Sequence, residues 1–239
     1  MIDTELDLAG NHLLGALPPH ERRLLLPRLD SVNLRTGQLL SDSGQRIRHL
    51  YFPSTAVISM MSLLESGATV ELASVGREGL VGLPALTGAE TMPNRIEVRR
   101  SGIGFRVAAS DLRAIYPELP TLQRMALLYM QALLTQVSQT AVCIRHHSLT
   151  TQLCRWLLLA LDRSPCNELD VTQQTIADML GVRREGVTEA VGKLAELQMI
   201  RHSRGHITVI DRAGLEGFSG ESYRIVRNEF DRLLSRAAG

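Results

Sequence analysis

The stretch Val171–Ile210 reads VTQQTIADMLGVRREGVTEAVGKLAELQMIRHSRGHITVI, and it decides the fold of the C-terminal part of the chain. Thr172 is a suitable N-cap, because its hydroxyl can accept a bond from an early helical N–H. Gly181 supplies the left-handed conformation in which many helices end. Between them, apolar residues recur at spacings of three and four, which predicts one buried helix face: Ile176, Met179 and Leu180.

A second helix is predicted to begin near Arg183, since apolar residues again recur at helical spacing: Val187, Ala190, Val191, Leu194 and Leu197. The other face of its first two turns is polar. Gly186 costs roughly 1 kcal/mol relative to Ala inside a helix, so we expect it to permit a close approach. Residues 200–210 then alternate and turn at Arg204-Gly205, which predicts a two-stranded wing.

The polar face of the second helix carries groups that can read base edges in the DNA major groove. Arg can donate two bonds to guanine, Glu can accept from cytosine, and the first residues of the second helix reach the bases in helix-turn-helix proteins. Arg201 and His206 are further candidates for phosphate contacts. The predicted DNA-binding residues are Thr172, Gln173, Arg183, Arg184, Glu185, Thr188, Glu189, Lys193, His202 and Arg204. The alternative is an ordinary packed helix pair.

This block resembles the C-terminal winged helix-turn-helix of the Crp/Fnr family of bacterial transcription regulators. In that family a recognition helix opening with Arg-Glu or a similar pair reads the operator, and Arg184-Glu185 stands at that place. The family's most studied member has Arg where this chain has Glu189, so no operator sequence carries over. The resemblance spans nearly the whole chain, most strongly at its C-terminus. It implies a homodimer that binds double-stranded DNA and contacts RNA polymerase.

Before this block, residues 31–107 form short alternating runs separated by Gly, Pro and Ser, which predicts an all-β sandwich or barrel. In the Crp/Fnr family this region is a β-roll that resembles the cyclic-nucleotide-binding domain. The expected fold class is therefore α+β. We expect a cyclic-nucleotide-binding-like sensor β-roll in residues 1–117, a dimerisation helix and hinge in residues 118–147, and the winged helix-turn-helix DNA-binding domain in residues 148–239.

The segment Gly76–Arg100 bears on whether the roll binds a ligand. By the resemblance, members that bind cyclic AMP hold the phosphate with an Arg-Ser pair and the ribose with a Glu after a Gly. Here Leu83 follows Gly82, and Asn94-Arg95 stands at the Arg-Ser position, which disfavours cyclic AMP. The candidate ligand-binding residues are Gly76, Arg77, Gly82, Leu83, Asn94 and Arg95.

Two alternatives stay open for this segment. A different anionic ligand would have four arginines as possible contacts: Arg77, Arg95, Arg99 and Arg100. With no ligand, Gly79 and Gly82 would only permit a tight turn in the roll. The effector is thus unknown, and its existence is itself open.

A long helix is predicted from Pro117 or Pro120 to about Ile144. One helix with two apolar stripes can pack on its own domain and on a partner at once. The first stripe has the spacing of a two-stranded coiled coil and is the predicted dimer interface: Leu127, Met130, Leu134, Val137, Ala141 and Ile144. The second lies beside it: Leu122, Ala126, Tyr129 and Leu133. Core packing alone is the alternative.

Residues 145–148 are the expected hinge, with Ser148 capping a helix over residues 149–161. The adjacent histidines of this hinge are interpreted as solvated, with a pH switch or a metal site as alternatives. After the wing, Asp211 is expected to cap a short helix. Residues 221–235 predict a last amphipathic helix, which we expect to pack on the DNA-binding domain.

Composition limits the other function classes. The 239 residues carry a net charge of +1, and from Arg145 onward 13 Lys and Arg face 12 Asp and Glu, so DNA binding must depend on local placement of charge. Three scattered cysteines, Cys143, Cys154 and Cys166, cannot supply four ligands to an iron–sulfur cluster. Three lone histidines give little support for haem: His12, His20 and His49. We expect no cofactor, no metal site and no catalytic site, and therefore no enzyme.

The start of the chain, MIDTELDLAG, lacks the pattern of a signal peptide. Purely apolar runs such as Trp156–Leu161 are too short to span a bilayer. We therefore expect a cytoplasmic protein that does not bind membranes. A second function class remains: a protein that binds a cyclic nucleotide or dinucleotide messenger and whose winged domain makes protein contacts.

Overall fold

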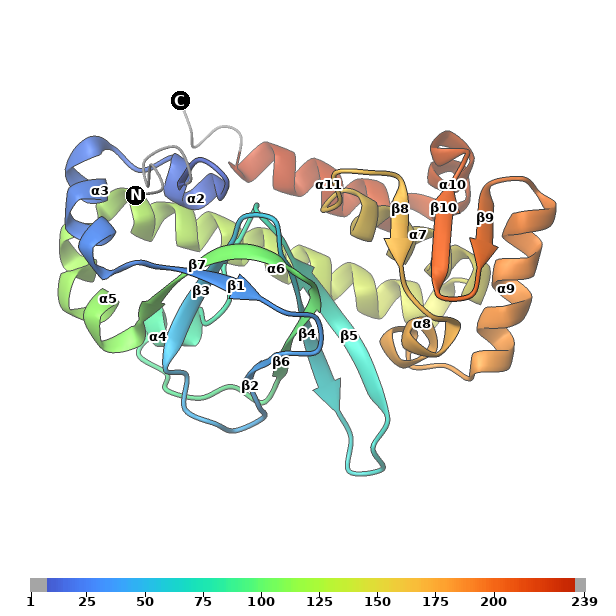
Figure 1. The fold of residues 1–239 in the computed structure, drawn as a ribbon, viewed down its shortest axis with the longest axis horizontal. Coiled ribbons are helices and arrows are strands. Elements are labelled where there is room, and N and C mark those ends of the chain that lie inside the picture. Colours follow the sequence, from blue (N-terminus) through green and yellow to red (C-terminus); the bar gives the residue numbers. More distant parts are fainter. Residues whose placement is uncertain (1–7, 235–239) are drawn as a thin grey trace. The chain divides into compact units, whose positions relative to one another are not determined.

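The structure is a computed structural model that describes residues 8–234 of the chain (Figure 1). These residues form two compact units. The first comprises residues up to 60, residues 74–134 and residues from 229, and the second comprises residues 61–73 and 135–228. Residues 1–7, which include most of the N-terminal segment without a signal-peptide pattern, lie outside the described residues, as does the expected helix end at Ser235.

Short strands make up the first unit, as the alternating runs predicted. One sheet has the order β1-β7-β3, and a second has the order β2-β6-β4-β5. Short helices precede and interrupt them: α2 (His12–Gly15), α3 (Pro19–Leu25), a 3-10 turn (Leu26–Arg28), α4 (Pro84–Thr87), α5 (Ala109–Ile115) and a second 3-10 turn (Tyr116–Glu118). The strands are β1 (Asp30–Leu34), β2 (Leu39–Ser41), β3 (His49–Pro53), β4 (Val57–Leu63), β5 (Thr69–Val75), β6 (Arg95–Arg100) and β7 (Gly102–Ala108).

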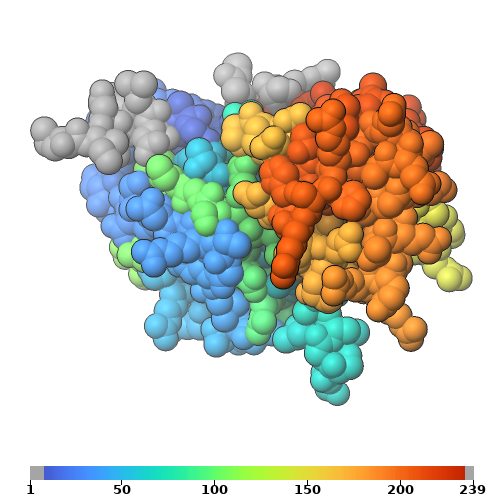
Figure 2. Space-filling model, turned by 45° about the vertical axis from the view of Figure 1, so that its right-hand side comes forward, coloured from blue at the N-terminus to red at the C-terminus, as the bar shows by residue number. Residues whose placement is uncertain are grey.

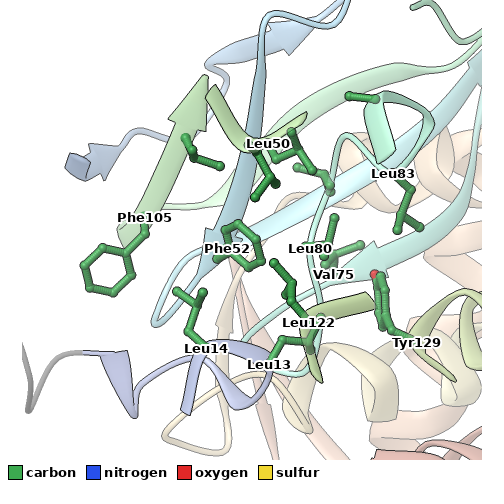
Figure 3. Close-up of a cluster of buried hydrophobic side chains, with 14 of the residues drawn as sticks. Leu13, Leu14, Leu50, Phe52, Val75, Leu80, Leu83, Phe105, Leu122 and Tyr129 are labelled. Carbon is green, nitrogen blue, oxygen red and sulfur yellow. The ribbon is translucent and has the colours of Figure 1, made fainter. Parts of the chain in front are cut away.

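The strands alternate inward and outward, which produces one apolar interior. In β3, Leu50 and Phe52 are fully buried while His49 and Tyr51 remain half-exposed. Figure 3 shows how side chains from both sheets, from α2 and from the long helix α6 (Pro120–His146) meet in this interior. The labelled members are Leu13, Leu14, Leu50, Phe52, Val75, Leu80, Leu83, Phe105, Leu122 and Tyr129.

Two buried polar side chains tie the short N-terminal helices to this interior. The amide of Asn11 donates to the carbonyls of Pro53 and Gly79 at 2.8 and 2.9 Å. The carboxylate of Glu21 accepts from the backbone N–H groups of Thr121 and Leu122 at 2.7 and 3.0 Å. Because the first N–H groups of a helix lack internal partners and carry partial positive charge, Glu21 stabilises the start of α6.

Helix α6 has the two apolar faces that the sequence predicted. Leu122, Ala126 and Tyr129 are buried in the first unit, and Leu133 is half-buried. The other stripe has no buried member: Leu127 and Leu134 expose 64% and 60% of their surfaces and Ile144 exposes 46%, Ala141 is exposed, and Met130 and Val137 are partly exposed. Its part in a dimer remains a prediction.

By length and composition alone, α6 is also the one described helix that could cross a membrane. The protein buries 28% of its most apolar window. The two apolar stripes account for this composition. Polar residues such as Gln131, Gln136 and Thr140 interrupt them, and Gln136 and Thr140 are themselves buried within the second unit. One apolar face of α6 is thus covered by the protein's own core.

The second unit contains helices and a small sheet of order β8-β10-β9. Its elements are the end of β4, most of β5, the end of α6, α7 (Leu149–Leu161), β8 (Glu168–Asp170), α8 (Gln173–Leu180), α9 (Arg184–Glu196), β9 (Ile200–Ser203), β10 (His206–Val209), α10 (Arg212–Phe218) and the first part of α11 (Gly220–Leu234). Asp211 caps α10 as expected, accepting from the N–H of Gly214.

Three expectations about this part need correction. Helix α6 continues through Arg145 and His146, and the positive charge of Arg145 suits a helix C-terminus. Only residues 147 and 148 therefore separate α6 from α7. Leu197 caps the end of α9 and is 46% exposed, so it does not belong to the buried stripe. Helix α11 packs within the second unit only up to residue 228, and Phe230 and Leu234 join the core of the first unit.

The packing of Tyr129 against the loop at Gly79 generates a prediction. A Cβ atom at Gly79 would overlap the ring of Tyr129, which is fully buried and cannot move aside. Gly79→Ala should therefore lower the free energy of unfolding by about 1–3 kcal/mol, measured by urea denaturation followed by circular dichroism.

The control for this substitution is Gly15→Ala in the same unit, where the nearest atom to the new Cβ lies at 3.4 Å. We expect a change of about 0.4–1 kcal/mol there, in the stabilising direction. Equal effects at the two positions would show that Tyr129 does not pack on Gly79 as described.

Candidate nucleic-acid interface

Helix α8 begins and ends as the sequence predicted. The hydroxyl of Thr172 accepts from the N–H of Thr175 at 3.1 Å and thereby caps the first turn. At the other end, Gly181 adopts φ +66°, which an L side chain tolerates poorly. The chain turns there and enters α9 at Arg183, whose extended backbone makes it the N-cap of the second helix.

Helix α9 presents one buried and one polar face. The buried side chains are Val187, Ala190, Val191 and Leu194. The predicted base-reading residues all lie on the exposed side: Arg183, Arg184, Glu185, Thr188, Glu189 and Lys193. The hydroxyl of Thr188 donates to the side-chain oxygen of Gln173 at 2.8 Å, so the outer faces of α8 and α9 are joined. The structure thus brings the predicted residues of both helices onto one surface.

Gly186 does permit a close approach, and the approaching group belongs to α7. A Cβ atom at this position would lie 2.8 Å from a methyl group of Leu149. The glycine therefore allows the first turns of α9 to pack tightly on α7. Gly186 is itself half-buried, whereas the preceding residues Arg184 and Glu185 are exposed.

The wing also forms as predicted, with β9 and β10 paired antiparallel and joined at Arg204-Gly205. His202 and Arg204 are exposed, as phosphate contacts require. His206 is different, because its Nδ1 lies 2.9 Å from a carboxylate oxygen of Asp170 and its Nε2 lies 3.8 Å from Glu168. Its ring is therefore engaged with two acidic residues of β8 within the sheet.

The predicted ligand-binding residues have separate roles in the first unit. The loop that starts at Gly76 is fastened to the N-terminal helices, because the N–H of His12 donates to the carbonyl of Arg77 at 2.8 Å. Leu83 is buried, and Figure 3 shows it among the apolar side chains of the interior. Gly82 has φ +97° and lies against β3, as a residue of a tight turn would.

Arg95 is held by an acidic partner. Its guanidinium donates two bonds to the carboxylate of Asp42, at 3.1 and 3.0 Å. The bond to Arg95 holds the pKa of Asp42 below its usual range. Asn94 precedes Arg95 and is half-exposed. An arginine paired in this bidentate way offers less of its charge to a phosphate than an unpaired one.

A small pocket lies on the roll, lined among others by Arg48, His49, Tyr51 and Gly82. Gly82 is the one member of the predicted ligand set that lines it. The space beside the loop at Gly79 is occupied by the ring of Tyr129. The geometry therefore favours the interpretation that Gly79 and Gly82 permit a turn and close packing.

Two of the three cysteines of the second unit are poor candidates for metal or redox chemistry, whereas the third, Cys166, is exposed. Cys143 and Cys154 are buried, and burial raises the pKa of both thiols, that of Cys154 to about 12. Thiols that stay protonated at neutral pH are poor ligands and nucleophiles. Over residues 8–234, no group of three or more His, Cys, Asp or Glu side chains is arranged to hold a metal ion.

Sequence reasoning missed two sets of residues. Tyr129 was assigned to a packing stripe, but its contact with the loop at Gly79 joins residues 50 positions apart. Thr69 and Glu71 in the β4–β5 hairpin contact residues of the helix-turn-helix unit more than 80 positions away. No local pattern indicates such pairs, because helical and strand periodicity report only which face of an element is buried.

Comparison with known proteins identifies a domain model that matches the helix-turn-helix region. Residues 151–218, which run from the first turn of α7 to the end of α10, match the model of the Crp-like helix-turn-helix domain. No curated protein matches the chain.

Solved structures match over most of the chain. A protein described as a transcriptional regulator of the Crp/Fnr family from Eubacterium rectale shares 20% identity, with 87% of this chain and 97% of that chain covered and a TM-score of 0.69. The Crp/Fnr family regulator TTHA1359 from Thermus thermophilus shares 21% identity, with 80% and 98% covered and a TM-score of 0.63.

The c-di-GMP-responsive global regulator CLP from Xanthomonas campestris shares 15% identity, with 80% of this chain and 99% of that chain covered and a TM-score of 0.65. At these identities the likeness concerns the fold. The predicted fold class, a β-roll followed by a long helix and a winged helix-turn-helix, is confirmed.

Proposed function

Because this chain carries a Crp-like helix-turn-helix domain and has the fold of the Crp/Fnr regulators, we propose that it is a sequence-specific DNA-binding transcription regulator of that type. The observation that carries the proposal is the exposed face of α9, where Arg184 and Glu185 stand in the first turn. Side chains of this kind at the start of a recognition helix read base edges. The related proteins named above are described as regulators, and none as an enzyme.

The protein acts in this proposal as a homodimer through the exposed stripe of α6. A run of exposed apolar side chains at coiled-coil spacing is unfavourable in water and is covered when a second copy of the helix packs against it. A two-fold dimer presents two recognition helices to half-sites about one DNA turn apart. The functional divisions are then residues 1–117 for the sensor, 118–147 for the dimerisation helix and hinge, and 148–239 for DNA binding.

The sensor roll works in this proposal without cyclic AMP. Support comes from Leu83, which lies in the apolar interior, and from Arg95, whose charge is paired with Asp42. A regulator of this type works in the cytoplasm and contacts RNA polymerase. The CLP structure belongs to a c-di-GMP-responsive protein, so a dinucleotide is the effector class to test first if one is required.

The proposed role of Arg184 leads to a quantitative prediction. Arg184→Ala should weaken binding to the preferred operator by about 1–3 kcal/mol and relax base preference at one position. The measurement is titration of labelled duplexes at fixed salt, since affinity depends steeply on salt concentration. Arg23→Ala, at an exposed position of α3, is the matched control and should bind as the wild type does.

If Arg184 touched only phosphate, its substitution would weaken operator and random duplexes equally. That result would remove Arg184 from the set of base-reading residues. The chain would remain a DNA-binding protein, but with a different recognition surface.

The dimer proposal is tested by Leu134→Asp. A carboxylate in the seam of the coiled coil would be buried without a partner. The free energy of dimerisation should therefore become less favourable by several kcal/mol. Analytical ultracentrifugation at micromolar concentration should then show a monomer. Leu197→Asp changes another exposed leucine, outside α6, and should leave the dimer intact. A Leu134→Asp protein that still sediments as a dimer would place the interface elsewhere.

A further inference from the structure

The β4–β5 hairpin belongs to the same compact unit as the helix-turn-helix. Residues 61–73 form its tip and group with residues 135–228. The tip protrudes from the surface in Figure 2, and Figure 1 draws β5 beside α8. The segment reads MSLLESGATVELA and contains two glutamates and no Lys or Arg. A hairpin of this charge is repelled by phosphate, so its contacts with the helices point to a role other than DNA contact.

The first of these contacts is made at the end of α8. The hydroxyl of Thr69 donates to the backbone carbonyl of Asp178 at 3.0 Å. Asp178 lies in the last turn of α8, where carbonyl groups lack the internal N–H partners that the rest of the helix has. Thr69 therefore supplies a donor to the end of the helix that leads into the turn.

The turn itself lies against the hairpin. A Cβ atom built at Gly181 would be 3.4 Å from the carbonyl oxygen of Thr69 and 3.4 Å from the Cβ of Val70. Gly181 has left-handed backbone geometry and joins α8 to the recognition helix α9. A side chain at this position would thus meet the hairpin, which lies beside the turn at the point where the chain enters α9.

Two further bonds fix the hairpin to other helices of the unit. The indole N–H of Trp156 in α7 donates to the carboxylate of Glu71 at 2.7 Å. The hydroxyl of Thr140 in α6 has two acceptors for its one proton, the carbonyl of Leu72 at 3.1 Å and the carbonyl of Gln136 at 2.9 Å. Four consecutive hairpin residues, 69–72, therefore contact α8, the turn, α7 and α6. An element held at so many points is rigid relative to the helices that it touches.

We propose that residues Thr69–Leu72 of the hairpin are positioning residues for DNA recognition: they hold the α8–α9 turn and so fix the angle at which α9 presents Arg184 and Glu185 to the bases. This inference rests on the proposed DNA-binding function. It assigns to a strand of the β-roll a direct part in sequence specificity, although no hairpin residue touches DNA.

Sequence-specific binding and charge-driven binding respond differently when α9 is displaced. Base readout requires groups placed to within a fraction of the length of a hydrogen bond, whereas phosphate attraction depends mainly on charge. A loosened turn should therefore weaken binding to the operator and leave binding to random DNA nearly unchanged. A hairpin that only stabilised the fold would reduce the folded fraction, and both kinds of binding would fall together.

The experiment uses pairs of substitutions in the full-length chain. Thr69→Val removes the hydroxyl and keeps the shape, and Thr69→Ser keeps the hydroxyl. Glu71→Leu removes the acceptor for Trp156, and Glu71→Gln keeps a side-chain carbonyl oxygen. Each protein is titrated with the operator selected for the wild type and with a random-sequence duplex at the same salt concentration. Trp156 is the single tryptophan, so its emission reports release of the hairpin.

We expect Thr69→Val and Glu71→Leu to lower operator affinity about tenfold, the order of effect of one or two lost hydrogen bonds. Random-duplex affinity should stay within about twofold, because the charge on the DNA-facing surface is unchanged. Thr69→Ser and Glu71→Gln should retain most of the wild-type preference. The emission of Trp156 should shift in Glu71→Leu and much less in Glu71→Gln.

Equal losses on both duplexes, or unchanged operator affinity in both Thr69→Val and Glu71→Leu, would overturn the inference. Thermal unfolding of each variant identifies a loss that comes from a smaller folded fraction. A wild-type chain that prefers no sequence would instead overturn the proposed function, and this inference with it. The wild-type titration therefore separates the two failures.

Discussion

A helix with apolar side chains on two faces needs two partners, and α6 finds one of them in its own chain. The face that includes Leu122 and Tyr129 is buried in the first unit, and the start of the helix is held by the buried carboxylate of Glu21. The stripe through Leu127 and Leu134 remains exposed. The rest of the proposed function depends on this uncovered stripe, because a second copy packed there doubles the DNA-reading surface.

The two units contribute different physical properties to this scheme. The interior of the first unit is filled by its own apolar side chains, with Tyr129 against the loop at Gly79. The second unit displays a polar face whose arginine and glutamate groups are suited to reading bases. The proposed DNA binding depends on charges at a few positions, since the net charge of the chain is only +1. Placement of a few side chains therefore matters more than overall charge. Contacts that position α9 are for this reason important to the proposed DNA recognition.

Much of this arrangement could be predicted from sequence, because it depends on local rules. The cap at Thr172, the left-handed turn at Gly181 and the two stripes of α6 all follow from residue type and periodicity. Other features depend on contacts between distant residues, and they were missed or misjudged. Arg95 is paired with Asp42, Tyr129 packs against the loop at Gly79, and Thr69 binds the end of α8. Periodicity shows that a face is buried, but not which residue covers it.

The measurement that tests the central claim most directly is selection of bound sequences from a random duplex pool, with the purified protein and no added ligand. The account predicts enrichment of a two-fold symmetric motif whose half-sites lie about one DNA turn apart. A repeat of the selection with cell extract would reveal dependence on an effector. If neither selection enriched a motif, the account of the protein as a dimeric reader of DNA sequence would be contradicted.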